Sequence, residues 1–174
     1  MKKTMVILAS VFTVIFLVWS SVRIVKEVSF YLNCKAYLQR AATANTIELA
    51  KPELVKAIEY AEQNNLTTGF VSIFLKNPTN DIGFWYNNIK ASYDELEKIS
   101  DDASALEKTN VLMKLRESLT ERYDGGTKIV VPSGISIYPN NVVYFWLGTL
   151  SCTGMCVFWT LAIIYLASKS NKEA

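Results

Sequence analysis

The apolar residues of the 174-residue chain are concentrated near its two ends. One stretch without any charge runs from residue 4 to 22, and a second runs from residue 129 to 168. A helix needs roughly 20 apolar residues to cross the hydrocarbon core of a bilayer, and Met5–Val22 and Val142–Ala167 approach or exceed that length. Because backbone in lipid must satisfy its own hydrogen bonds, we expect both segments to be transmembrane helices.

The first apolar segment has a second interpretation, a cleaved secretory signal peptide. Its basic start, Met-Lys-Lys, and the residues at its end are compatible with that alternative. An uncleaved anchor is favoured because apolar residues continue beyond the segment at helical spacing, at Ile24, Val28 and Tyr31. We therefore expect Arg23–Ala44 to form a helix that is continuous with the first span.

The polar middle of the chain begins with a second predicted helix. Asn45 is its candidate N-cap, and Glu48 follows three residues later to complete a capping box. Pro52 either kinks this helix or marks a fresh start, and Asn64 is expected near its end. The connector Leu66–Asn80 that follows is compatible with either a short strand or a helical turn.

Two further helices and a hairpin are expected before the second span. One helix runs from Asp81 to about Ile99. The next opens at Ser100–Ser104, where Asp101 and Asp102 favour a helix start. It places Tyr123 on its apolar face and ends at Asp124, Gly125 and Gly126. The pattern over Thr127–Pro139, with a turn at Pro132, Ser133 and Gly134, predicts a short β-hairpin.

The predicted fold is mainly α, with two transmembrane helices flanking an extramembrane helical domain that has a short β-hairpin before the second span. The expected domains are an N-terminal transmembrane helix with a short cytoplasmic start over residues 1–22, an extracytoplasmic helical domain over 23–139, a C-terminal transmembrane helix over 140–168 and a cytoplasmic tail over 169–174.

Charge near the ends of the spans predicts their orientation. The two termini together carry four lysines and one glutamate, a net charge of +3, whereas the region between the spans has a net charge of −1. Four basic residues soon after the first span favour the opposite orientation, but long loops translocate largely regardless of charge. We expect an integral membrane protein with both termini in the cytoplasm and the middle domain outside, in the periplasm or its equivalent.

The residue types that most catalytic and metal sites require are scarce. The chain has no histidine, so Ser-His and Cys-His nucleophilic pairs and the commonest metal ligand are excluded. Cys34 is the single cysteine between the spans, and no glycine-rich phosphate loop occurs. The nearly neutral middle domain argues against nucleic-acid binding. We expect a protein that is not an enzyme, with no catalytic residue, metal or cofactor.

Two groups of residues are candidates for interaction. Phe84, Trp85 and Tyr86 stand in a row inside a polar segment, and they are core residues, a membrane-interface anchor or a partner-binding surface. Helical spacing places Trp85 toward the core, with at least one of its neighbours near the surface. On the second span, Gly148, Cys152 and Cys156 form a ridge of small residues that suits helix packing, within the chain or with another protein.

Four segments of the chain resemble a family of uncharacterised bacterial two-span membrane proteins, many of them cyanobacterial. They are NTIELAKPELVKAIEYAEQNNLTTGF, DIGFWYNNIKASYDELEKI, LEKTNVLMKLRESL and VPSGISIYPNN. The resemblance implies the two-span architecture and a bacterial membrane. That family has no assigned activity, so the resemblance implies no functional residue.

Two functions fit these observations. The first is a non-enzymatic accessory or interaction subunit, whose helical extracytoplasmic domain and second span bind membrane lipid and a membrane-protein partner or a second copy of the chain. The second is a membrane-anchored sensor with a helical ligand-binding domain, which would need a separate signalling partner because only seven residues follow Ala167. A membrane factor of toxin–antitoxin or phage type is a third candidate.

Overall fold

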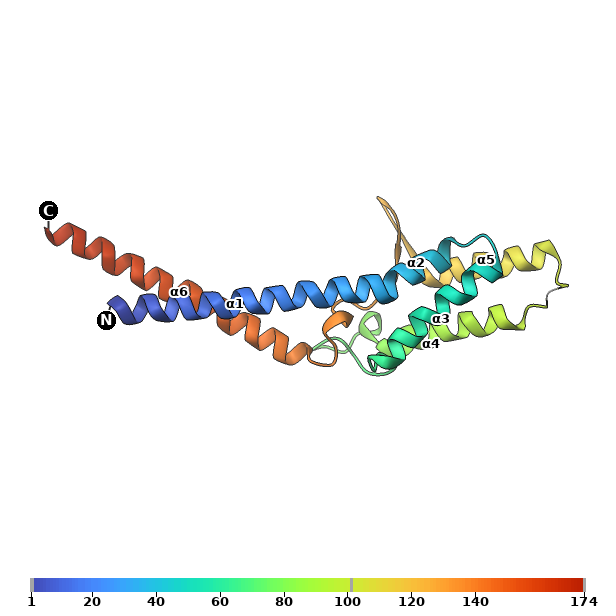
Figure 1. Ribbon diagram of the computed structural model, residues 1–174, viewed down its shortest axis with the longest axis horizontal. Coiled ribbons are helices and arrows are strands. Elements are labelled where there is room, and N and C mark those ends of the chain that lie inside the picture. Colours follow the sequence, from blue (N-terminus) through green and yellow to red (C-terminus); the bar gives the residue numbers. More distant parts are fainter. Residues whose placement is uncertain (1, 101, 174) are drawn as a thin grey trace. The chain divides into compact units, whose positions relative to one another are not determined.

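The computed structural model describes residues 2–100 and 102–173, with the side chains of Lys2 and residues 169–173 left out. The predicted cytoplasmic tail, the lysines that orient the spans and the role of Asp101 therefore fall partly or wholly outside the described residues. The elements, shown in Figure 1, are α1 (Lys2–Phe30), a π-helical turn (Tyr31–Lys35), α2 (Ala36–Thr43), α3 (Ile47–Gln63), a 3₁₀ turn (Pro78–Asn80), α4 (Ile82–Lys98), α5 (Ala105–Leu119), β1 (Thr120–Tyr123), β2 (Gly126–Ile129), a second 3₁₀ turn (Ile135–Ile137) and α6 (Asn141–Glu173).

The predicted fold class is confirmed. The protein is mainly helical, two long apolar helices stand at the ends of the chain, and a two-stranded antiparallel hairpin precedes the last helix. The chain divides into two compact units. The helix-pair unit contains the residues up to Lys26 and those from Asn140 onward, and the middle unit is Glu27–Pro139.

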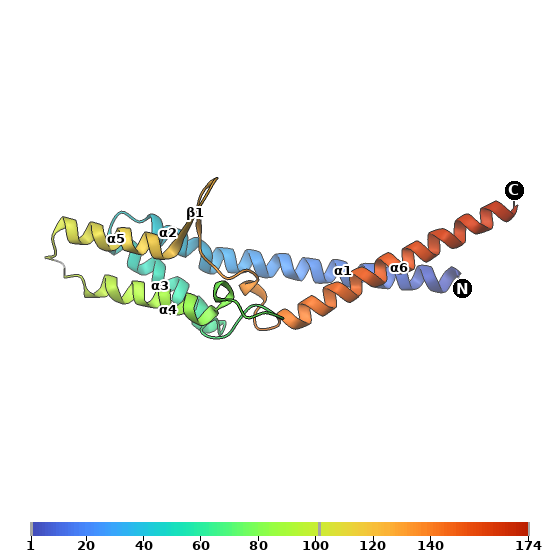
Figure 2. The same cartoon turned by 180° about the vertical axis from the view of Figure 1, so that it is seen from behind.

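The helix-pair unit consists of the first part of α1 and all of α6, which run antiparallel (Figures 1 and 2). The rings of Phe12 and Phe158 stack with their centroids 5.6 Å apart. The indole N–H of Trp19 donates to the carbonyl oxygen of Tyr144 at 2.8 Å. Aromatic side chains of α1 thus pack on α6, where Trp19 lies against Gly148 and Phe12 lies against Gly154.

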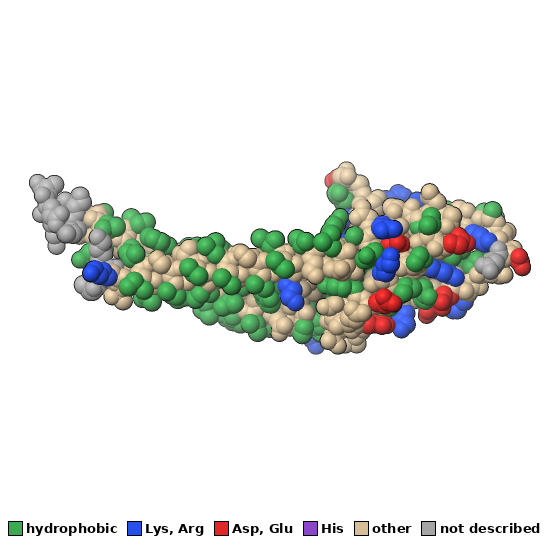
Figure 3. Space-filling view, viewed as in Figure 1, with side chains coloured by type: hydrophobic (Ala, Val, Ile, Leu, Met, Phe, Trp, Pro, Cys, Tyr) green, Lys and Arg blue, Asp and Glu red, His purple; other side chains and the backbone are tan. Residues whose placement is uncertain are grey.

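Both helices of this unit are long and apolar enough to cross a membrane, by length and composition, and they are the two such helices among the described residues. Few of their side chains are buried. The core helix of a soluble protein would instead be mostly buried by the rest of the protein. An exposed apolar surface of this size is unusual for a soluble monomeric protein. In Figure 3, hydrophobic side chains predominate over the described parts of α1 and α6, whereas most of the Lys, Arg, Asp and Glu side chains lie on the middle unit.

The middle unit is a bundle of four helical segments. The π-helical turn and α2 pack on α3, α3 packs on α4, α4 on α5, and α5 returns to α2. Small residues allow the closest approach, since Ala50, Ala57 and Ala61 of α3 are almost fully buried. The largest fully buried side chains of the bundle are Phe30, Cys34, Leu38, Leu54, Ile82 and Leu96. The thiol of Cys34 lies 3.8 Å from the carbonyl oxygen of Ala57.

The helix starts follow capping chemistry. Asp81 and Ser104 accept from backbone N–H groups three residues ahead, so α4 and α5 begin where the sequence predicts. The prediction of Asn45 as an N-cap was wrong by one residue, because the hydroxyl of Thr46 accepts from Leu49 N at 3.3 Å. Pro52 neither begins nor ends α3 but lies inside it.

The hairpin lies earlier in the chain than expected. The helix predicted to reach Tyr123 ends at Leu119, and Thr120–Tyr123 pairs with Gly126–Ile129. The Asp124-Gly125 dipeptide is a strong two-residue hairpin signal, and it closes a turn here rather than only stopping a helix. A hairpin before the last helix is confirmed, but its expected position over Thr127–Pro139 was wrong, and Ile135–Ile137 forms a 3₁₀ turn instead.

Candidate functional site

The three aromatic residues of the predicted interaction surface lie in the first turn of α4. Asp81 caps this helix by accepting from the N–H of Phe84 at 3.0 Å. Successive side chains on a helix differ in direction by about 100°, so the three cannot share one face. Phe84 is 70% exposed, whereas Trp85 and Tyr86 are 6% and 8% exposed. Only Phe84 therefore presents its ring to the surroundings.

Trp85 joins α4 to the segment that follows the hairpin. Its indole N–H donates to the carbonyl oxygen of Val130 at 3.1 Å. The N–H of Val130 in turn donates to the carbonyl oxygen of Leu119 at 3.0 Å, which extends the hairpin pairing by one residue. Trp85 therefore fixes the segment that follows β2 against the turn of α4 that contains Phe84.

Tyr86 joins α4 to α3. Its hydroxyl donates to Glu62 Oε1 at 2.5 Å, and Lys90 Nζ lies 3.4 Å from the same hydroxyl and 3.7 Å from the same carboxylate oxygen. The hydrogen bond to Glu62 raises the pKa of the Tyr86 phenol above its ordinary value. This arrangement fits a structural clamp between two helices, since each group has its partner within the bundle.

A groove of about 740 Å³ runs between the start of α4 and the base of the hairpin. Phe84 and Trp85 contribute to one side of it, and Val130 and Val131 contribute to the other. The remaining lining residues are Lys35, Pro78, Thr79, Asn80, Asp81, Asn88, Ile89, Ser118, Leu119, Thr120, Glu121, Lys128, Ile129, Pro132 and Ser133. The lining of the groove thus combines apolar residues with charged groups of both signs.

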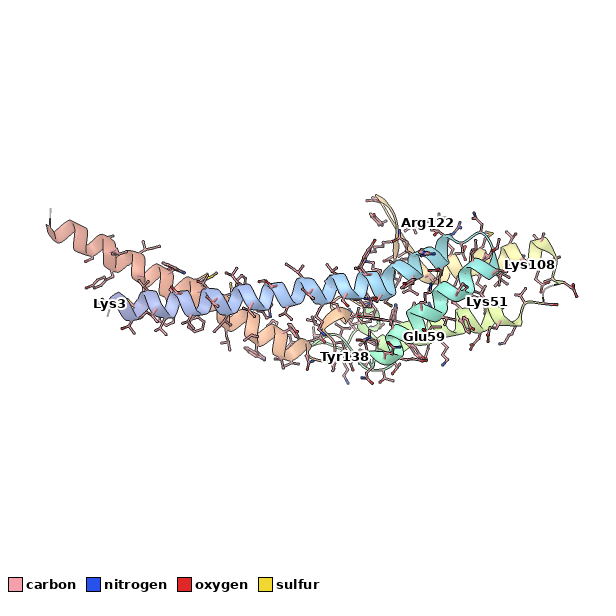
Figure 4. The ribbon with its side chains drawn as sticks, in the orientation of Figure 1. Lys3, Lys51, Glu59, Lys108, Arg122 and Tyr138 are labelled. Atoms are coloured by element: carbon pink, nitrogen blue, oxygen red, sulfur yellow. The ribbon has the colours of Figure 1, made fainter. Side chains whose placement is uncertain are left out.

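A second groove, of about 580 Å³, shares Lys35, Thr120, Lys128 and Ile129 with the first. These shared residues belong to the π-helical turn and to the base of the hairpin. The hairpin itself is exposed along most of both strands and carries Arg122, which Figure 4 labels. The two grooves and the exposed hairpin form a varied surface on one unit, which we call the hairpin surface.

The residues of the predicted ridge on the second span differ in their burial. Gly148 is buried, and a side-chain carbon added to it would overlap the indole ring of Trp19. Gly154 lies against Phe12 in the same way, with 2.6 Å between such a carbon and the Phe12 ring. Cys152 and Cys156 are exposed on α6. Gly148 therefore serves packing within the chain, and the two cysteines remain available to other molecules.

The described residues contain no group of three or more Cys, Asp or Glu side chains that could hold a metal ion. Cys34 is a free thiol buried in the core of the bundle. Sequence reasoning missed most of the groove, including Ser118–Glu121 and Val130–Ser133. Such residues carry no chemical signature, and only the pairing of distant segments brings them together.

Comparison with known proteins finds no matching family model, no matching curated protein and no matching solved structure.

Proposed function

We propose that this chain is a non-enzymatic integral membrane protein that acts as an accessory subunit of another membrane protein. In this proposal α1 and α6 cross a bacterial inner membrane, both termini lie in the cytoplasm and the middle unit lies outside. The two helices are long, apolar and largely exposed, which supports insertion in lipid. The lysines at the two termini favour the cytoplasmic side.

The observation that carries the interaction role is the exposed ring of Phe84 beside the groove. Large aromatic side chains that stand at a pocket are frequent anchors of protein interfaces. The backbone under Phe84 is fixed, because Asp81 caps the helix and Trp85 is bonded to Val130. A fixed backbone lowers the conformational entropy that is lost on binding, which suits a recognition site.

The lining of the groove indicates the chemistry of the partner. Phe84, Val130 and Val131 suit an apolar side chain of the bound segment. Lys35 and Lys128 on one hand, and Asp81 and Glu121 on the other, suit polar or charged groups beside it. We infer that the groove accepts an extracytoplasmic segment of another membrane protein that has an apolar residue flanked by polar ones.

Purification of the full chain in mild detergent tests this proposal. The wild-type protein is expected to retain a discrete membrane-protein partner at a fixed stoichiometry, and Phe84→Ala is expected to lose it without a change in folding. Leu106→Ala is the matched control, since Leu106 is 71% exposed on α5 and lines neither groove. Recovery of monomers alone, or of homo-oligomers that Phe84→Ala leaves intact, would contradict the proposal.

A sensor is the second candidate, because the volume of the groove lies within the range of about 300–1,000 Å³ typical of small-molecule sites. Helix α1 also has residues in both units, so a shift at one end has a continuous element along which to pass. A ligand-dependent rise in the unfolding temperature of the full chain, abolished by Phe84→Ala, would favour the sensor over the accessory subunit.

A further inference from the structure

The segment between α3 and α4 forms a closed loop with a well-anchored base. Phe70 and Asp81 pair as an isolated antiparallel bridge, and Val71 N donates to Asn80 O at 3.0 Å. Leu66 and Val71 are buried in the core of the bundle. The base of the loop is therefore fixed to the middle unit, which allows the tip, residues 72–77, to present its side chains reproducibly.

The tip of this loop is apolar and exposed. Phe74 and Leu75 are 70% and 77% exposed, the latter the highest exposure among the large hydrophobic residues that the structure describes. The N–H of Leu75 donates to the hydroxyl of Ser72 at 3.2 Å, which shapes the turn. Lys76 follows directly, and it is the single charged residue between Leu66 and Asn80. Interfacial membrane segments combine Phe and Leu side chains with Lys or Arg, and the tip of this loop has both kinds of residue.

The loop lies at the end of the middle unit where the chain enters and leaves. Ser136 donates to Glu27, the first residue of the unit, at 2.6 Å. The hydroxyl of Tyr138, labelled in Figure 4, donates to the carbonyl oxygen of Thr68 at 3.0 Å. Tyr138 thus ties the root of the loop to the segment that leads into α6. Asn141 lies three positions after Tyr138, a reach of roughly 11 Å of extended chain.

We propose that Phe74 and Leu75 insert into the headgroup–acyl boundary of the outer leaflet of the membrane that α1 and α6 cross, with Lys76 beside lipid phosphates. This inference rests on the proposed membrane insertion and adds a second, interfacial attachment. A phospholipid surface fits the tip better than a protein pocket, because the tip is tethered to the chain that enters the bilayer and its single charge complements phosphate. The attachment would orient the hairpin surface relative to the membrane.

Site-directed spin labelling of the full chain, reconstituted in vesicles of phosphatidylethanolamine and phosphatidylglycerol, tests the inference. Single cysteines replace Leu75, Leu106 and Val157 in turn, in a chain carrying Cys152→Ala and Cys156→Ala. Cys34 is retained because it is buried. Leu106 is the matched control in the middle unit, and Val157 is an exposed residue of α6. For each spin label, the collision rate with oxygen, which is enriched in lipid, is compared with the collision rate of the same label with a water-soluble nickel chelate.

The expected result is an oxygen-to-nickel ratio at residue 75 well above that at residue 106 and below that at residue 157. A ratio at residue 75 equal to that at residue 106, with residue 157 in lipid, would overturn the inference and leave the membrane proposal standing. A label at residue 75 shielded from both reagents would show a protein cover and overturn it as well. A nickel-accessible residue 157 would refute membrane insertion itself.

Discussion

The indole nitrogen of Trp85 lies 3.1 Å from the carbonyl oxygen of Val130, 45 residues further along the chain. This hydrogen bond joins α4 to the segment that follows β2, and both line the groove beside Phe84. A buried aromatic residue thus determines where an exposed neighbour stands relative to the opposite wall. The proposed recognition role of Phe84 therefore depends on Trp85, which is itself only 6% exposed.

Replacing Trp85 with Phe should lower the free energy of unfolding by about 1 kcal/mol, because ring burial is largely kept while the bond to Val130 is lost. Urea unfolding of the full chain in mild detergent measures this change. Partner retention should weaken as well, since the Val130 side of the groove is released. Unchanged stability together with unchanged partner retention would show that the bond does not position the groove.

The Tyr86–Glu62 bond makes stability depend on pH above the neutral range. The carboxylate raises the pKa of Tyr86, so the phenol stays protonated in the folded chain at pH values where it ionises in the unfolded chain. This contribution is fully present below the unfolded pKa of about 10 and is lost as the pH rises through the folded pKa. The hydrogen bond to Tyr86 also raises the pKa of Lys90, so the contribution of Lys90 to stability is likewise lost as the pH rises.

Tyr86→Phe should therefore reduce the loss of stability that occurs as the pH rises above the ordinary tyrosine pKa of about 10. Urea unfolding of the full chain at a series of pH values checks this. Part of the dependence should remain, because burial raises the pKa of Tyr60 and the bond to Glu97 raises the pKa of Tyr93. Tyr123→Phe, on the exposed hairpin, is the control. Identical pH profiles for Tyr86→Phe and the wild type would refute the clamp.

The contact between the π-helical turn and α3 has no room for larger side chains. Ala57 is 1% exposed and its carbonyl oxygen lies against the thiol of Cys34. Ala57→Leu should destabilise the protein by about 1–3 kcal/mol through overpacking. Ala91→Leu places the same change on an exposed position of α4 and should have little effect. Equal urea midpoints for the two variants would contradict the described packing.

Gly148 should tolerate no side chain in the helix-pair unit, because an added carbon overlaps Trp19. Gly148→Val is expected to weaken the contact between α1 and α6 by about 1–3 kcal/mol. Cys152→Val, one turn further along at an exposed position, is the matched control. Titration of the full chain with SDS measures the difference, and a Gly148→Val midpoint no lower than that of the control would show that these helices do not pack through Gly148.

The helices were predictable because local signals agree there. Asp81 and Ser104 stand where capping chemistry and apolar periodicity coincide, and the structure uses both. Asn45 and Thr46 are both favourable N-cap residue types, and Asn is the stronger of the two, so residue type alone pointed to the wrong position. The apolar runs at the two ends of the chain needed no tertiary information, since length and composition suffice for a long apolar helix.

The hairpin was misplaced because two local signals compete. Leu112, Leu115, Leu119 and Tyr123 keep helical spacing, which favours continuing α5. The pairing of Thr120 with Ile129 and the burial of Ile129 in the core favour strands instead. The pairing and the burial depend on contacts between segments that are separate in sequence, and the spacing of apolar residues within one segment does not predict such contacts. The groove was invisible for the same reason, because its walls come from parts of the chain far apart in sequence.

Photo-crosslinking at residue 84 in intact cells tests the central claim, that the exposed ring of Phe84 contacts a partner membrane protein. A photoreactive amino acid replaces Phe84 in the full chain, and a second variant carries it at Leu106, which is equally exposed. A single membrane protein crosslinked at residue 84 and absent at residue 106 is the predicted result. Crosslinks at residue 84 that stay within the chain, reach only lipid, or match those at residue 106 would contradict the account.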